Sequence, residues 1–271
     1  MSAKVITVIL QKGGSGKSST SQAISAIYGS QGKRVLLIDL DPQRNTSYAS
    51  GITNPDKTIT DVLYGECTAQ DAIVSCTYYD LIPSDRYLSN IQSALVDTSV
   101  PDSVRNSISA AEFEIVSMTL LKKSLKSILD SYDLIVIDSA PSLGNLAFMA
   151  LVASDYALVT AEAAVYSLVG LHDLAKTVQA VKASYNPSLE VAGVLLCRVN
   201  ARTTLSKDIK EIILSHKEDM GLHLFETQIR NSVEISKAQM AMMSLIEFAP
   251  KAKVTQDYMD FCAELAERIK L

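Results

Sequence analysis

The chain has 271 residues, a net charge of -5 and a hydrophobic content of 48%, so it can bury a sizeable core and does not resemble a protein that coats nucleic acid with its whole surface. No apolar run approaches the roughly 20 residues that span a bilayer, and no signal-peptide pattern is present, so we expect a cytoplasmic protein. The cysteines lack C-x-x-C spacing, which argues against a zinc site or disulfide framework and favours buried free thiols; they are Cys67, Cys76, Cys197 and Cys262.

The first elements in chain order form a strand, a turn and a helix. Residues 4–10 are apolar and β-branched, which predicts a buried strand, and the spacing of Ala and Ile in 18–28 predicts a helix. The turn between them contains Gly13, Gly14 and Gly16. Glycines in such a turn let backbone N–H groups surround an anion, and the following helix N-terminus adds partial positive charge. The turn is therefore predicted to bind phosphate.

Two lysines accompany these glycines. Lys17 is expected to reach the β- and γ-phosphates of a nucleotide, and the Ser18 hydroxyl to bind magnesium. The usual phosphate-loop spacing requires a glycine at position 11, where this chain has Gln11. Lys12 follows it directly, and the spacing alone does not explain this second lysine.

Acidic residues end two later predicted strands. Asp39 and Asp41 follow the apolar run in "LLIDLDPQRN", and Asp138 follows the run in "LIVIDSAPSLG". A single aspartate at a strand end is more often a turn former. Two such strands behind one phosphate loop instead favour carboxylates that bind magnesium or its waters, with Asp41 placed to orient an attacking water.

Apolar runs and helical stretches alternate along the rest of the chain. This alternation predicts the α/β class, with a doubly wound, mostly parallel sheet covered by helices on both faces in a single domain of residues 1–271. The polar stretch 97–107 is expected to be a surface loop. Further strands are predicted at 34–41, 79–84, 132–140, 156–162, 189–200 and 222–229, and further helices at 118–129 and 168–183.

The combined motifs resemble those of the ParA/MinD ATPases. Residues 12–18 resemble the deviant Walker A loop of these P-loop NTPases, "LLIDLDPQRN" their A-prime motif and "YDLIVIDSAPSLG" their Walker B motif. The resemblance is strongest to ParA/Soj-type partition ATPases without an N-terminal DNA-binding extension. It covers nearly the whole chain, with matching segments that begin at Asp80, Glu162, Val199 and Gln228. It implies ATP and Mg²⁺ as cofactors.

The resemblance also assigns roles to individual residues. It implies that Lys12 crosses to the ATP of the opposite subunit when two monomers close around two nucleotides, so the homodimer would depend on ATP. Three positions depart from the family pattern: Ser18 replaces threonine, Arg44 replaces glycine and Ile229 replaces proline. The implied nucleotide-binding residues are Lys12, Gly13, Gly14, Ser15, Gly16, Lys17, Ser18 and Ser19, with Asn231 at the adenine; the implied magnesium residues are Ser18, Asp39 and Asp138, and the catalytic residues Lys12, Lys17 and Asp41.

DNA binding is a separate implication of the resemblance. Arg202 and Arg230 lie in segments that match the family's non-specific DNA contacts, and Lys251 and Lys253 are further candidates. Residues 195–253 hold nine basic against seven acidic side chains, a modest local excess in an acidic chain. The family further implies a ParB-like centromere-binding partner that stimulates hydrolysis, and a nucleoid-associated protein.

Three other classes share features of this sequence. A MinD-like membrane positioner requires a basic amphipathic C-terminal helix, whereas residues 257–271 carry four acidic side chains and are predicted to be a core-packing helix. An iron–sulfur reductase would need a cysteine pair near the sheet edge. A ligase of the dethiobiotin synthetase type would need a second charged constellation for its substrate. Partition therefore stands first and MinD-like or other cargo positioning second, with no membrane contact expected.

Overall fold

A computed structural model describes residues 2–10, 14, 16–91, 110–141, 143–162, 167–200 and 223–271. Several predicted features lie outside these described residues, namely Lys12, Gly13, Ser15, Arg202 and the expected surface loop 97–107.

The described residues contain a sheet of seven strands in the order β3-β4-β2-β5-β1-β6-β7. Every neighbouring pair is parallel except β3 and β4, which form an antiparallel edge. The predicted mostly parallel sheet is therefore confirmed. The strands are β1 (Lys4–Ile9), β2 (Val35–Leu40), β3 (Val74–Ser75), β4 (Asp80–Ile82), β5 (Leu134–Ser139), β6 (Tyr156–Glu162) and β7 (Glu190–Cys197).

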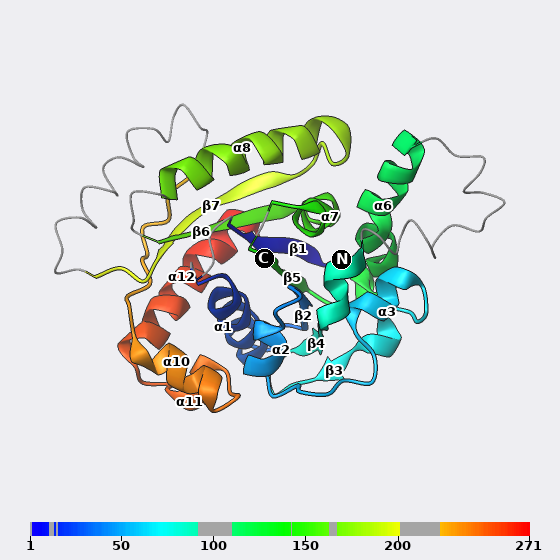
Figure 1. Ribbon diagram of the computed structural model, residues 1–271. Coiled ribbons are helices and arrows are strands. Elements are labelled where there is room, and N and C mark those ends of the chain that lie inside the picture. Colours follow the sequence, from blue (N-terminus) through cyan, green and yellow to red (C-terminus); the bar gives the residue numbers. More distant parts are fainter. Residues whose placement is uncertain are drawn as a thin grey trace.

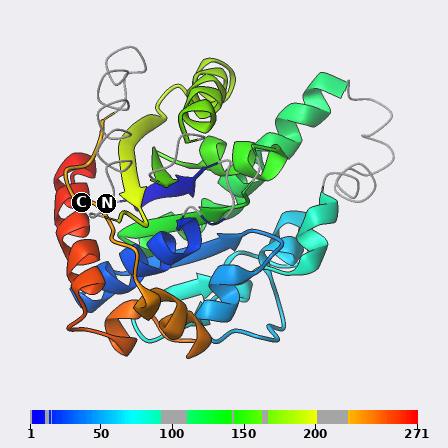
Figure 2. The ribbon, with the colours of Figure 1, turned by 60° about the vertical axis from the view of Figure 1, so that its left-hand side comes forward.

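Helices cover both faces of this sheet (Figure 1). One core contains side chains of α1, α10, α11 and α12, and the other those of α3, α6, α7 and α8, so the fold is doubly wound as predicted. Figure 2 shows α12 (red) beside α1 (blue), which it contacts. The helices are α1 (Lys17–Ser30), α2 (Asn45–Ala49), α3 (Ile59–Tyr64), α6 (Ala110–Leu125), α7 (Asn145–Ala153), α8 (Ser167–Ser184), α10 (Val233–Met240), α11 (Leu245–Phe248) and α12 (Lys253–Ile269).

The α12 helix is part of the core. Its apolar residues recur at helical spacing, and Tyr258, Phe261 and Leu265 are buried against the face that carries α1. The Tyr28 hydroxyl of α1 donates a hydrogen bond of 2.7 Å to the Cys262 carbonyl oxygen. The prediction of a core-packing C-terminal helix is confirmed.

Several predicted elements differ from the structure, among them the strands predicted at 79–84 and 189–200, which are shorter as β4 and β7. Within the described part of 222–229 no strand forms, and Leu224 and Arg230 only make isolated parallel bridges to Val194 and Val199 of the β7 region. Apolar alternation marked this segment as a strand, but bonds at separate points do not make a ladder. The helix predicted to continue to residue 129 ends at Leu125, because the chain must turn there to enter β5.

The cysteines and the membrane prediction have mixed outcomes. All four cysteines are free thiols as predicted, but only Cys197 and Cys262 are buried, while Cys67 and Cys76 are half-buried. Across the described ranges, no helix combines the length and apolar character needed to cross a bilayer.

Candidate functional site

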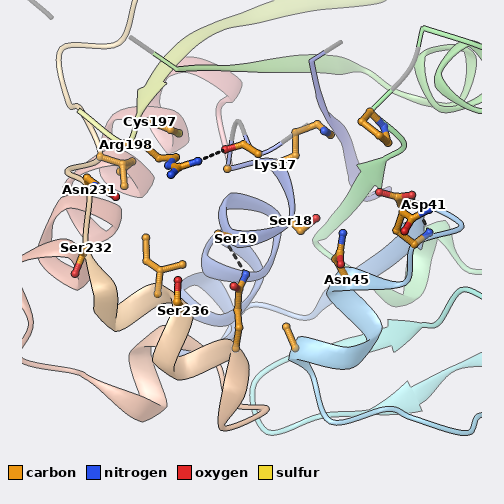
Figure 3. Close-up of a pocket in the computed structure, with 18 of the residues that line it drawn as sticks. Lys17, Ser18, Ser19, Asp41, Asn45, Cys197, Arg198, Asn231, Ser232 and Ser236 are labelled. Carbon is orange, nitrogen blue, oxygen red and sulfur yellow. Dashed lines mark hydrogen bonds between the residues drawn. The ribbon is translucent and has the colours of Figure 1, made fainter. Parts of the chain in front are cut away.

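A pocket with a volume of about 630 Å³ lies where the parallel strands end. Its lining comes from the N-terminus of α1, the β2–α2 turn and α2, the end of β7, and α10 with the segment before it (Figure 3). This edge is where open α/β sheets bind ligands, and the volume is in the range of small-molecule sites.

The glycine turn forms one wall of the pocket. Gly14 and Gly16 have φ angles of 80° and 89°, a left-handed conformation that side chains disfavour. A Cβ atom at position 16 would lie 3.2 Å from the Cys197 Cβ, a tight approach that also favours glycine there. Gly16 is the N-cap of α1 and no side chain in the described residues caps that helix. The first N–H groups of α1 are thus available to an anion.

Lys17 begins α1 and has a side chain that is only 6% exposed. Burial lowers the pKa of Lys17, while the carboxyl groups of Asp138 and Asp41 act in the opposite direction. Ser18 lines the pocket beside it. A cation held in this way at a helix N-terminus suits the β- and γ-phosphates of a nucleotide.

Asp39 and Asp138 lie beneath the pocket rather than on its wall. They are directly paired across β2 and β5, and both side chains are fully buried. Burial raises the pKa of both carboxyl groups, and the Asp138 charge raises the pKa of Asp39 further. Asp39 Oδ2 accepts hydrogen bonds from the Ser47 backbone N–H and hydroxyl at 2.8 and 2.7 Å. This geometry favours a role for Asp39 in holding α2 rather than in binding magnesium directly.

Asp138 contacts the helix that carries Lys17. Its Oδ1 accepts a hydrogen bond of 3.3 Å from the Ser21 hydroxyl and its Oδ2 one of 2.6 Å from the Thr46 hydroxyl. A hydrogen bond from Ser18 also acts on this carboxylate and lowers its pKa. Asp138 therefore lies directly behind the predicted magnesium ligand Ser18.

Asp41 is the predicted carboxylate that reaches the pocket. Its side chain is 4% exposed, lines the pocket and accepts a hydrogen bond of 2.9 Å from the Gln43 backbone N–H. Burial raises the pKa of Asp41, and the Lys17 ammonium opposes this. An acid in this place can orient a water against a bound phosphate.

The opposite wall of the pocket is formed by α10 and the residues before it. Asn231 lines the pocket, next to Ile229, and its backbone N–H donates a 3.0 Å hydrogen bond to the Val199 carbonyl. Ser232, Ser236 and Gln239 also face the pocket. Gln239 donates a 3.1 Å hydrogen bond to the Ser19 hydroxyl and so joins this wall to α1.

The sequence prediction missed several lining residues. Positions 232, 236 and 239 are polar at helical spacing, a signal that could have placed them on one face. Tyr48 also lines the pocket and its ring lies 4.9 Å from the Arg44 guanidinium. The backbone of Arg44 is left-handed, with φ of 60°, which explains why glycine is the expected residue in the family pattern.

The described candidates for DNA binding are not among the residues that line the pocket. Arg230 pairs with Asp257 of α12 through two hydrogen bonds of 2.6 Å, from its Nε and from one terminal nitrogen. Its positive charge is therefore partly neutralised within the chain. Lys251 and Lys253 are exposed just before and at the start of α12.

The described residues fit magnesium only together with a nucleotide. No cluster of three or more histidine, cysteine or acidic side chains suited to a metal occurs among them. Magnesium at phosphate sites usually takes one or two protein ligands and completes its shell with phosphate oxygens and water. Ser18 on the wall, with Asp138 behind it, matches that arrangement.

The site combines a glycine turn after the first strand of a parallel sheet with a buried lysine in the first turn of the following helix. This combination defines a P-loop nucleotide-binding protein. The comparisons with known proteins agree. A family profile for an AAA domain matches residues 3–191. The sporulation initiation inhibitor protein Soj of Bacillus subtilis is 33% identical over 267 residues, which cover 97% of this chain and 98% of that protein.

A further curated relative and a solved structure are also similar to this chain. The chromosome partitioning protein ParA of Caulobacter vibrioides is 31% identical over 271 residues, covering 98% of this chain and 94% of that protein. A solved structure of cobyrinic acid a,c-diamide synthase from Mycobacterium smegmatis, with bound ADP and magnesium, has 26% identity and a TM-score of 0.80, covering 99% of this chain and 96% of that one. The chain belongs to the AAA-domain family and, within it, to the ParA/Soj-type partition ATPases.

Proposed function

We propose that this chain is an ATP-dependent partition ATPase whose ATP-bound homodimer binds DNA without sequence preference and moves or spaces a cargo. The observation that supports it best is the pocket itself, which brings Lys17, Ser18 and Asp41 to one wall at the sheet edge. The predicted cofactors are ATP and Mg²⁺, and a homologous structure contains ADP and magnesium.

Hydrolysis would use the two buried charges of that wall. Lys17 neutralises charge on the β- and γ-phosphates, and Asp41 orients the attacking water on the side of the γ-phosphate. Because Asp41 lines the pocket while Asp39 lies beneath it, Asp41 is the better candidate for this role.

Dimerisation would depend on Lys12, and this step rests on the sequence resemblance alone because Lys12 lies outside the described residues. A lysine that contacts the partner's ATP makes the nucleotide part of the interface, and ADP lacks the phosphate that both subunits would hold. We expect Lys12→Ala to bind ATP yet remain a monomer in light scattering with ATP and magnesium. Lys33→Ala, which changes an exposed lysine after α1, serves as the control. A Lys12→Ala protein that dimerises normally would rule out the trans role.

DNA binding would join the weak basic surfaces of two subunits. Two weak sites on one dimer act together through effective concentration, so ATP switches DNA binding on. Contacts to phosphates carry little sequence information and weaken steeply with salt. A ParB-like partner bound to the cargo would stimulate hydrolysis and release the protein from the nucleoid, so the protein would be cytoplasmic and nucleoid-associated.

The test is binding to two unrelated DNA duplexes with ATP and with ADP, in the Asp41→Ala background that blocks hydrolysis. We expect binding with ATP only, with equal affinity for both duplexes, and a loss of roughly one unit of salt slope per subunit for Arg230→Ala or Arg202→Ala. Equal binding with ADP and ATP would remove the switch. Unchanged binding by both arginine variants would place the DNA surface elsewhere.

MinD-like positioning of a membrane or protein cargo is the second candidate. The apolar face of α12 is buried against the face that carries α1, so this helix does not offer the free apolar face that a membrane-surface helix needs. Sedimentation with anionic vesicles in the presence of ATP distinguishes the two candidates, and we expect no binding.

A further inference from the structure

Arg198 is the first residue after β7 and has an unusual backbone. Its φ angle is 55°, in the left-handed region, where a residue with a Cβ costs roughly 1–2 kcal/mol. Such a conformation persists when the surrounding contacts hold it, and it often marks a functional position. Arg198 also lines the nucleotide pocket, although it was not among the predicted site residues.

The Arg198 guanidinium contacts the glycine turn directly. One terminal nitrogen donates a hydrogen bond of 3.1 Å to the Gly14 carbonyl oxygen (Figure 3). The same nitrogen lies 3.8 Å from Glu162 Oε1 at the end of β6, the neighbouring strand. The preceding residue, Cys197, fills the space beside Gly16. The end of β7 therefore touches the phosphate loop at both of its described glycines.

We propose that Arg198 is a positioning residue that braces the phosphate loop through Gly14 and so raises the affinity for the phosphates of ATP. This hydrogen bond holds the Gly14 carbonyl oxygen on the side of the Arg198 guanidinium and so restricts the backbone of the turn at that residue. A loop fixed in this way loses less freedom when nucleotide binds.

The two contacts of the Arg198 side chain, with Gly14 and with Glu162, are unsuited to a mainly structural role. The Arg198 side chain is 49% exposed, and its 3.8 Å approach to Glu162 is a surface ion pair, a kind that contributes little to folding stability. Loss of the Arg198 side chain is therefore expected to change the affinity for nucleotide rather than the free energy of unfolding. The inference rests on the ATP binding proposed above.

The test compares Arg198→Met, which keeps the stem and removes every donor, with Arg198→Lys, which keeps the charge and one donor group. We expect Met to weaken ATP binding about 5- to 20-fold in titration calorimetry and Lys to recover part of the loss. The KM for ATP should rise, whereas kcat should stay within twofold of the wild-type value, because the Arg198–Gly14 contact acts on binding. The matched control is Arg34→Met, because Arg34 is an exposed, ion-paired arginine before β2 at the opposite end of the sheet.

Unchanged ATP affinity in Arg198→Met, or a lower kcat at unchanged KM, would overturn the inference. If wild type itself fails to bind ATP, the proposed function fails rather than the brace alone. If Arg198→Met does not fold, Arg198→Gln takes its place, because the shorter glutamine side chain is not expected to reach Gly14. Wild-type ATP affinity in Arg198→Gln would then overturn the inference.

Discussion

The two walls of the pocket are built in different ways. The phosphate wall stands on Lys17, Asp39 and Asp138, which are 6%, 0% and 0% exposed. The α10 wall is less buried: of its lining residues, Asn231 and Ser236 are exposed, and Ser232, Ile235 and Gln239 are half-buried. Buried charges with satisfied partners fix one geometry, because any change leaves a group unpaired in a dry environment. Lys17 and the two aspartates beneath the pocket are thus held in one arrangement, whereas the lining side chains of α10 are held by fewer buried contacts.

The largest expected effect follows from removing Lys17, the cation of the phosphate wall. Lys17→Ala takes away the buried ammonium that neutralises the phosphates, and we expect ATP affinity to fall about a thousandfold, as for a broken buried charge pair. Titration calorimetry with ATP and magnesium measures it. Lys237→Ala, at an exposed position of α10, is the control and should bind as wild type does. A loss below tenfold for Lys17→Ala would contradict the difference between the walls.

A change at Asp41 should separate binding from hydrolysis. Asp41→Ala is expected to bind ATP and to accumulate the dimer, while phosphate release falls by two to three orders of magnitude, on the scale of lost acid–base or positioning groups. The exposed Asp56 provides the control as Asp56→Ala. Wild-type turnover in Asp41→Ala would assign water positioning to Asp39 or to the substrate phosphate itself.

The buried pair should also give stability a pH dependence. Burial raises the pKa of Asp39 to about 7 and that of Asp138 to about 6. A carboxyl group with a raised pKa holds its proton more tightly in the folded chain, so its stabilisation is complete below about pH 4 and is lost as the pH rises towards 7. Asp39→Asn should remove on the order of 2 kcal/mol of this change in the free energy of unfolding between pH 5 and 8.

Urea unfolding of the nucleotide-free protein at several pH values measures this slope. The control is Asp133→Asn, because the Arg34 guanidinium lowers the pKa of the half-buried Asp133 to about 2. Its contribution is lost only below that range, so Asp133→Asn should leave the slope from pH 5 to 8 unchanged. If the free energy of unfolding depends on pH equally in wild type and in Asp39→Asn, folding does not change the pKa of Asp39.

The smallest expected effect concerns the Arg230–Asp257 pair behind the α10 wall. If DNA phosphates compete with Asp257 for Arg230, then Asp257→Asn should raise the DNA affinity of the ATP state about threefold, since one competing charge is removed. Asp260→Asn, at an exposed position of α12, controls for net charge. A weaker DNA affinity in Asp257→Asn would indicate that the pair orients the surface rather than masking it.

The sequence by itself determined the parts of this protein that depend on neighbours in the chain. The parallel sheet, the strand–turn–helix order around Gly14 and Gly16, and the aspartates at the strand ends follow from apolar periodicity and from the backbone demands of a phosphate turn. The family followed as well, because the motifs lie at fixed spacing. The strand predicted for 222–229 failed, since periodicity cannot show whether a ladder partner is present.

Only the tertiary structure decided which polar groups meet across long separations. Arg198 reaches Gly14 across 184 positions, Gln239 reaches Ser19 across 220, and Arg230 pairs with Asp257 on another element. It also placed Asp39 beneath the pocket and Asp41 on its wall, although both follow the same apolar run. These outcomes depend on side-chain direction and burial, which are set when helices and strands dock against one another and which no local pattern encodes.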